Sequence, residues 1–371
     1  MEKIVLIIEI IYNLIISLAF IMFPHRSSFL KALSKESTSK VPLYCTGYPE
    51  LEFIDNYINQ YNLKTDKKAL ILNNKNYSII EQIGFDAISL WDFRRGEGGY
   101  TLDNDKKVDG WGRIYKGEWY MWDGVFKNEK IVQNWEYLRL PSKKNLELLK
   151  SFLSRSIKNL DYVISLPGLF EKTWQSMGFH YFAKCLKKQN LDFLEMIVQF
   201  FSDYVKTLIK VLQKTGVKLF LIADDLGYKN RTFISKELWR KLFYKEYIEI
   251  TNLVHQKKQH IIIHSDGYIS DMMGTFIDLG FDAVQSLEPS AGVDIFSLFK
   301  KFQNEICFIG NLEMSLLSFG TPQQVRNYTI KLITKAKEHD CSLVVSPSHQ
   351  INAKCKPKNI NAIIETTKIF K

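Results

Sequence analysis

Residues 260–289, HIIIHSDGYISDMMGTFIDLGFDAVQSLEP, carry two apolar runs on either side of an amphipathic stretch. The runs HIIIHSD (260–266) and DAVQSLEP (282–289) have the length and composition of buried strands, and residues 269–279 between them have helical spacing. A strand, a helix and a second strand of these lengths form a parallel βαβ unit. The stretch therefore predicts an α/β fold with a parallel sheet.

The same alternation extends over most of the chain. Six more strands are expected at 41–45, 85–91, 162–168, 218–224, 306–313 and 342–349. Four more helices are expected at 193–214, 236–256, 295–302 and 322–338. Eight strands alternating with helices predict a single closed (β/α)8 TIM barrel. An open doubly wound sheet is the alternative, although no Gly-rich dinucleotide loop follows the first strand.

Residues 94–140 interrupt this pattern after the second predicted strand. They are rich in glycine and aromatic residues, which is typical of turns and small hairpins. An insertion at this point of a barrel lies over the C-terminal mouth, so a lid-like role is expected. Its tryptophans Trp111, Trp119 and Trp122 either face a ligand or form a small separate core, and we expect the core.

Composition restricts the class of protein. The chain has 371 residues, of which 46% are hydrophobic, enough for a sizeable globular core. Its formal charge of +10 comes from lysines spread along the chain, which indicates a solvated surface rather than nucleic-acid binding. Five cysteines without a CxxC pair favour neither a disulfide framework nor an all-cysteine zinc site, and a cytoplasmic location is expected.

The first residues are treated as a separate leader, 1–23, ahead of a catalytic domain over 24–371. Residues 4–23 are apolar over about the length that spans a bilayer, but Glu9 interrupts them. The leader is interpreted either as a membrane anchor, with basic residues after it holding the domain in the cytoplasm, or as a start-site extension ahead of Met22.

Polar residues follow seven of the eight predicted strands at their C-terminal ends, where the active site of a TIM barrel forms. Each of them taken alone could simply cap the next helix. Together they define the candidate site. We predict five as catalytic, namely Asp92, Asp225, His264, Asp266 and His349. We predict four as substrate-binding, namely Glu171, Asp224, Asn311 and Ser348.

His264 and Asp266 are two residues apart on one strand, so their side chains point to the same side. If that side is the barrel interior, Glu288 and His349 reach the same volume from other strands. His264, Asp266 and Glu288 would then suit a divalent ion such as zinc. The alternative is a metal-free polar network that holds a carboxylate and an imidazole for acid–base chemistry.

With these residues in place, the chain resembles the uroporphyrinogen decarboxylase (URO-D) superfamily from about residue 26 to its C-terminus. The resemblance rests on HRSSFLKAL, KVPLY, ADDLGYKNRTFISKELWRKLFYKEY, the stretch 260–289, GVDIFSLFKKF, FIGNLE, GTPQQVRNYTIKLI and SPSHQINAKCKPKNINAII. It implies a (β/α)8 barrel. It also implies either porphyrinogen decarboxylation or methyl transfer that involves a corrinoid protein or a thiol.

The chain departs from both branches of that superfamily. The decarboxylases hold their substrate with an Arg-rich N-terminal loop, and the corresponding LYCTGYPELEF (43–53) contains no arginine. Asp92 and His349 could still occupy places resembling the decarboxylase aspartate and late histidine. The zinc methyltransferases have His-x-Cys after strand five, and this chain has His264 with Asp266. They also have a cysteine after strand eight, and this chain has Ser348-His349 there.

The resemblance is nearer to the corrinoid-dependent methyltransferase branch. A ligand set of oxygen and nitrogen would tune a metal towards oxygen substrates rather than thiols. We therefore expect a methyltransferase that acts on a small O- or N-methylated compound, with zinc as the candidate metal and a corrinoid protein as partner. A cofactor-free porphyrinogen decarboxylase (a lyase of porphyrin biosynthesis) and a non-catalytic ligand-binding barrel are the alternatives.

Overall fold

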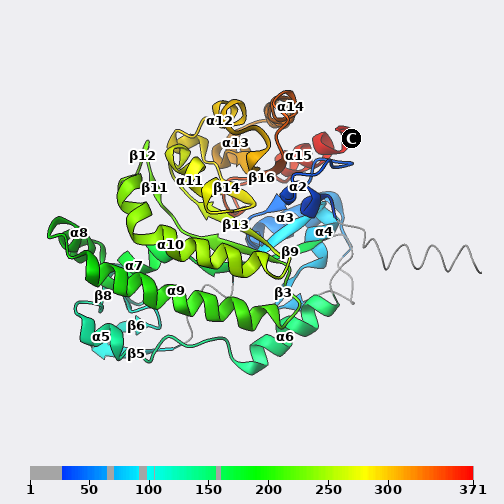
Figure 1. Cartoon of the computed structure of the whole chain (residues 1–371). Coiled ribbons are helices and arrows are strands. Elements are labelled where there is room, and N and C mark those ends of the chain that lie inside the picture. The colour runs from blue at the N-terminus through cyan, green and yellow to red at the C-terminus, as the bar shows by residue number, and fades with distance from the viewer. Residues whose placement is uncertain (1–26, 65–70, 92–97, 104, 156–159, 371) are drawn as a thin grey trace, which may run out of the picture.

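The computed structural model describes residues 27–64, 71–91, 98–103, 105–155 and 160–370. Its centre is one eight-stranded parallel sheet whose strands follow one another in chain order (Figure 1). The strands are β1 (Tyr44–Cys45), β4 (Ala87–Leu90), β9 (Asp161–Pro167), β10 (Leu219–Ala223), β13 (His260–Ser265), β14 (Ala283–Ser286), β15 (Cys307–Leu312) and β16 (Leu343–Pro347).

The sheet closes on itself. A parallel bridge joins Leu43 to Val345, and the backbone N–H of Val345 donates to the carbonyl of Pro42 at 2.9 Å. This contact connects β1 with β16, so the predicted (β/α)8 barrel is confirmed. All eight predicted strands are found, although β1 is shorter than expected. Pro42 has no N–H to donate to a ladder, which limits pairing at this edge.

Helices cover the outside of the barrel (Figure 1). They are α3 (Leu51–Tyr61), α4 (Ser78–Ile83), α6 (Lys143–Ser154), α7 (Leu169–Met177), α8 (Phe179–Lys187), α9 (Leu191–Gln213), α10 (Lys236–His255), α11 (Met273–Asp278), α12 (Ile295–Phe302), α13 (Met314–Phe319), α14 (Pro322–Glu338) and α15 (Pro357–Ile369). A further helix, α2 (Ser28–Leu33), lies at the N-terminal end of the barrel, where its buried side chains join the inner apolar cluster. The predicted helix over 269–279 begins as a 3-10 turn, Ser270–Met272, and becomes α-helical only in α11. Short hairpins join β2 (Ile71–Leu72) to β3 (Lys75–Asn76) and β11 (Gly227–Tyr228) to β12 (Arg231–Thr232).

The core has two apolar layers, and the alternation of side chains along each strand separates them. In β13, Ile261 and Ile263 belong to the large cluster packed under the helices, whereas Ile262 belongs to the smaller cluster inside the barrel. His264 has the same parity as Ile262, so its side chain enters the barrel interior. The side of the strand that carries His264 thus faces the barrel interior, as a site inside the barrel requires.

The insertion after the second strand is also confirmed. It forms an antiparallel sheet of β5 (Gly99–Asp103), β6 (Lys106–Asp109), β7 (Arg113–Lys116) and β8 (Trp119–Gly124), followed by α5 (Glu129–Gln133). Asp123 of β8 pairs with Gly178, at the end of α7. Its action as a lid stays a prediction.

The three tryptophans of the insertion do not share one environment. Trp111 is fully buried against Phe201 and Tyr204 of α9, so the expected core is confirmed for this residue. Trp119 and Trp122 are 81% and 61% exposed, and for them the expectation was wrong. Both lie on β8, the last strand of the small sheet, where Trp122 stacks on Trp174 of α7 and contacts Tyr120.

The predicted leader, 1–23, lies outside the described residues. Within the part of the chain that the structure describes, no helix combines the length and the apolar character needed to cross a membrane.

Candidate active site

The barrel interior becomes polar towards the carboxyl ends of the strands. His264 of β13 lies in register with Gln285 of β14, and both side chains are buried. Thr46 and Ser348 supply further polar atoms from the ends of β1 and β16. This polar layer lies beyond the apolar layer to which Ile262 belongs, at the C-terminal mouth where the site was predicted.

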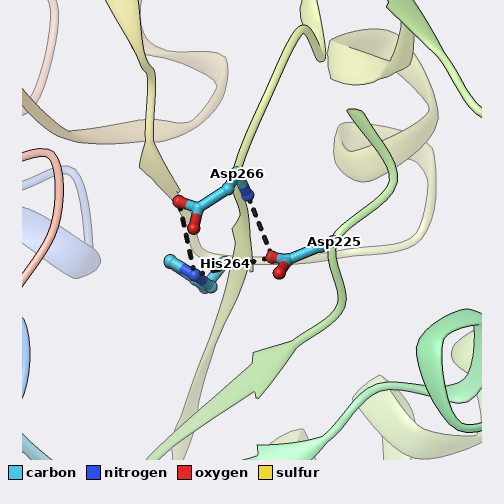
Figure 2. Close-up of side chains that lie close together, drawn as sticks. All are labelled: Asp225, His264 and Asp266. Carbon is cyan, nitrogen blue, oxygen red and sulfur yellow. Dashed lines mark hydrogen bonds and ion pairs between the residues drawn. The ribbon is translucent and has the colours of Figure 1, made fainter. Parts of the chain in front are cut away.

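Three of the predicted catalytic residues come together at this mouth (Figure 2). The Nε2 atom of His264 lies 3.6 Å from Oδ1 of Asp266 and 3.7 Å from Oδ1 of Asp225. The backbone N–H of Asp266 donates to Asp225 at 3.1 Å. The ends of β10 and β13 therefore bring two carboxylates to one imidazole.

Two glycines allow this approach. Gly227 and Gly267 meet backbone to backbone, and a Cβ built on Gly267 would lie 2.4 Å from the carbonyl carbon of Gly227. Gly267 also has a φ of +82°, a conformation that costs other residues energy. The glycine in His-Ser-Asp-Gly thus lets the segment after Asp266 approach the segment after Asp225.

Asp266 also belongs to a second group of side chains that could bind a metal ion, together with Glu288 and His349. His349 Nε2 lies 3.4 Å from Oδ1 of Asp266, and His349 Nδ1 is bonded to the Ser348 hydroxyl at 2.9 Å. Glu288 accepts from the backbone N–H of Gly267 at 3.0 Å. Donor atoms of Asp266, Glu288 and His349 lie within 4.8 Å of one another, and so do those of Asp225, His264 and Asp266.

The predicted metal set is therefore divided between these two groups. His264 and Glu288 were expected to share one ion with Asp266, but in the structure each of them belongs to a different group. Asp225, predicted only as catalytic, takes the third position beside His264. Side chains beyond a strand end no longer follow strand parity, which is why spacing alone did not identify the partner of His264.

Burial and neighbouring charges shift the pKa values of these groups in different directions. Burial, reinforced by the negative charge of Glu171, raises the pKa of Asp225 to about 6. Burial acts on Asp266 in the same direction, but His264 and His349 outweigh it and lower the pKa of Asp266 to about 2. The hydrogen bond with Asp266 raises the pKa of His349 to about 8. At neutral pH the mouth thus holds an ionised carboxylate beside a proton-bearing imidazole.

Asp224, a predicted substrate-binding residue, has a structural position. It is fully buried, and its carboxylate accepts from the backbone N–H groups of Phe170 and Glu171 and from the hydroxyl of Tyr247. These donors lie at the start of α7 and on α10. Asp224 thus caps α7, which precedes it in the chain, and not the helix that follows its strand, as the alternative interpretation had it. The structure offers no exposed face of its side chain for a substrate.

Glu171 lies on α7, near enough to Asp225 to influence its charge. Its carboxylate accepts from Gln175 at 2.5 Å and lies 3.7 Å from the ammonium of Lys172. The amide oxygen of Gln175 in turn accepts from Arg113 of the insertion. Glu171 is thus at the edge of the site, and its contact with substrate stays a prediction.

The two other predicted substrate-binding residues are buried. Asn311 donates to the carbonyl of Leu287 at 2.5 Å and accepts from Tyr328 at 2.6 Å, so its amide joins β15 to neighbouring elements. Ser348 bonds to the ring of His349 through its hydroxyl. The side chains of both residues are bonded to neighbouring groups of the protein, and their contact with substrate stays a prediction. Asp92, predicted as catalytic, lies outside the described residues.

Sequence reasoning missed Gln285. It is fully buried, and its amide contacts His264, Thr46 and Ser348. The only available signal was a lone amide inside the apolar strand DAVQSLEP. A buried polar group of this kind needs partners, and its presence in a strand interior indicates a network.

Comparison with known proteins agrees with this architecture. The model of the family "Uroporphyrinogen decarboxylase (URO-D)" matches residues 174–370. Among solved structures, a methyltransferase from Methanosarcina mazei superimposes with a TM-score of 0.66 at 15% identity, over 92% of this chain and 97% of that one. At this identity the similarity establishes a shared fold.

Two more distant structures are a B12-independent methionine synthase from Shewanella sp. W3-18-1 and a 3-keto-D-glucoside 4-epimerase from E. coli. Each has a TM-score of 0.42, with 12% and 10% identity. They match over 89% and 88% of this chain and over 98% and 99% of their own chains. Scores this low support no inference. Comparison with the sequences of curated proteins gives no match.

Proposed function

The chain belongs to the uroporphyrinogen decarboxylase (URO-D) family, and on this premise we propose that it is a methyltransferase acting on a small O- or N-methylated compound. The observation that carries the proposal is the group of Asp225, His264 and Asp266 at the barrel mouth. It combines one imidazole and two carboxylates, which are ligands of borderline divalent ions.

The distances in this group fit a metal ion. Two ligands at about 2.1 Å from a tetrahedral zinc ion are about 3.4 Å apart. His264 Nε2 is 3.6 and 3.7 Å from the two carboxylate oxygens, so small adjustments would bring all three into coordination. A metal held here would act as a Lewis acid on the oxygen or nitrogen that carries the methyl group.

The proton for the leaving group would come from His349. Its Nε2 faces Asp266 at 3.4 Å, and in the metal-free protein the hydrogen bond with Asp266 raises the pKa of this ring. In the proposed reaction the bond between the methyl carbon and its oxygen or nitrogen breaks, and the electron pair stays on the heteroatom. The heteroatom would take the proton from His349, and a corrinoid carried by a partner protein would supply the cobalt(I) nucleophile that accepts the methyl group.

The charge of the mouth favours this proposal over porphyrinogen decarboxylation. Carboxylates of Asp225, Asp266 and Glu288 face the mouth, and residues 43–53 offer no arginine to bind a substrate rich in carboxylates. Without a metal these carboxylates would repel a polyanionic substrate, and with a metal such a substrate would still lack arginine partners from residues 43–53. Asp92, on which the decarboxylase alternative depends, lies outside the described residues.

The test combines metal analysis with an activity assay on the full chain. We expect purified protein to contain a divalent metal and to demethylate members of a panel of O- and N-methyl compounds with cob(I)alamin as acceptor. His264→Gln should lose the metal and the activity, whereas His180→Gln, on the exposed surface of α8, should keep both.

Asp266→Ala and Asp271→Ala form a second matched pair. A protein without metal whose activity survives Asp266→Ala would refute the methyltransferase proposal. A tetrapyrrole in the native mass spectrum would support decarboxylation instead, and the absence of both activities would support a ligand-binding barrel.

A further inference from the structure

A buried amide of β14 contacts the central imidazole of the site. Gln285 lies directly across from His264 in the strand register, and its side-chain oxygen is hydrogen-bonded to Nδ1 of that ring. Its side-chain nitrogen donates to the hydroxyl of Thr46 at 3.0 Å and to the backbone carbonyl of Ser348 at 3.2 Å. Gln285 thus links three strands through the barrel interior.

These partners determine which way the amide points. The Ser348 carbonyl can only accept a hydrogen bond, so Gln285 must present its NH2 group there. A flipped amide would place its oxygen against that carbonyl and leave two buried polar groups without a suitable partner, which costs free energy. The amide oxygen of Gln285 is consequently turned towards His264.

The orientation of the amide in turn determines the tautomer of the imidazole. The oxygen of Gln285 can only accept, so Nδ1 of His264 must carry the hydrogen. In the neutral ring, Nε2 is then the basic nitrogen, and it points between the oxygens of Asp225 and Asp266. A lone pair and two carboxylate oxygens converge there, an arrangement that a cation stabilises.

We propose that Gln285 is the positioning residue of this site: it holds His264 as the Nδ1–H tautomer and thereby presents Nε2 for metal binding. Hydrogen bonds of this kind orient metal-binding histidines and raise their basicity. The inference about metal affinity rests on the proposed function. The inference about the tautomer does not depend on it.

The same network reaches the second histidine. Ser348 accepts from Gln285 through its carbonyl and holds Nδ1 of His349 through its hydroxyl. Both imidazoles of the mouth are therefore anchored at Nδ1, and both direct Nε2 towards Asp266. Loss of the Gln285 amide would release the backbone at Ser348 as well as the ring of His264.

The experiment uses the full chain labelled with ¹⁵N-histidine. The ¹⁵N signals of His264 are assigned with the His264→Gln variant, and zinc affinity is measured by competition with a chromophoric chelator. With the spectrum recorded for the neutral ring, we expect the Nδ1–H tautomer in the wild type. Gln285→Met, which keeps the length of the side chain but makes no such bonds, should yield a mixture of tautomers and a zinc affinity about 10- to 100-fold lower.

Two further variants separate positioning from general damage. Gln285→Glu keeps an oxygen facing Nδ1, so it should keep the Nδ1–H tautomer. Its second oxygen lies against the Ser348 carbonyl, so this variant should also be less stable than the wild type. Asn359→Leu removes another buried amide, bonded to the carbonyls of Leu317 and Gly320, and should change neither measurement.

An Nε2–H tautomer in the wild type, or a Gln285→Met variant with unchanged tautomer, would overturn the inference. If the wild type binds no zinc, the metal part of the proposed function fails, and the tautomer measurement still decides the role of Gln285.

Discussion

Replacing Gly267 with alanine should damage both the fold and the site. Gly267 directly follows Asp266, and its φ is +82°. The new Cβ would lie 2.4, 2.5 and 2.8 Å from three backbone atoms of Gly227. Backbone atoms cannot rotate away as a side chain can, so the segments after β10 and β13 would have to separate. Asp225 and Asp266 would then lose the relative position that their 3.1 Å hydrogen bond maintains.

The expected cost has two contributions. A left-handed backbone costs alanine about 1–2 kcal/mol, and overpacking typically adds about 1–3 kcal/mol. Gly216 separates the two terms, because it has a φ of +91° but nothing within 4 Å of a built Cβ. The stability of Gly216→Ala should therefore fall only by the backbone cost. The stability of Gly267→Ala should fall by both costs, about 2–5 kcal/mol in all.

Urea denaturation of the two variants measures these costs, and zinc titration measures the effect on the site. We expect Gly267→Ala to bind zinc more weakly and Gly216→Ala to bind it as the wild type does. If Gly267→Ala were no less stable than Gly216→Ala, the close approach of Gly227 would not be what requires glycine at position 267.

Three further outcomes are expected. Burial raises the pKa of Asp282, but hydrogen bonds from His255 and His260 outweigh it and lower the pKa from 3.8 to about 2. This shift corresponds to about 2 kcal/mol of folding free energy. Asp282→Asn should show this deficit in urea denaturation at pH 5–6. The deficit should shrink as the pH falls below 3.8 and the carboxyl protonates, and also as the pH rises through the raised pKa of His255. Tyr247→Phe removes the donor to the carboxylate that caps α7 and the acceptor of a backbone N–H, so thermal and urea denaturation should show a loss of about 1–3 kcal/mol. Trp111→Ala should cost about 3–5 kcal/mol in the same assay, whereas the exposed Trp119→Ala should stay near the wild type.

The strands were predictable because their apolar pattern reflects burial on both sides of the barrel wall. Ile261, Ile262 and Ile263 pack alternately outside and inside, and such continuous runs stand out in a sequence. The exact ends were less predictable, since they depend on pairing across the sheet. The bridge between Leu43 and Val345 joins residues from opposite ends of the chain.

The site was predictable only at the level of strand ends. Asp225, His264, Asp266 and His349 do meet, as the barrel rule implies. The roles of individual residues depend on hydrogen bonds between distant segments. Gln285 bonds to Thr46, which lies 239 residues away, and no local pattern contains that information.

The packing of the insertion affects how the protein could be divided experimentally. Trp111 is buried against α9, and Arg113 bonds to Gln175 of α7, whose start is capped by Asp224. Removing β5–β8 would expose apolar surface on α9 and take a hydrogen-bond donor from Gln175, next to Glu171. The insertion is therefore not a module that can be deleted or exchanged. A shortened protein made for crystallography or for grafting another specificity would have to retain it.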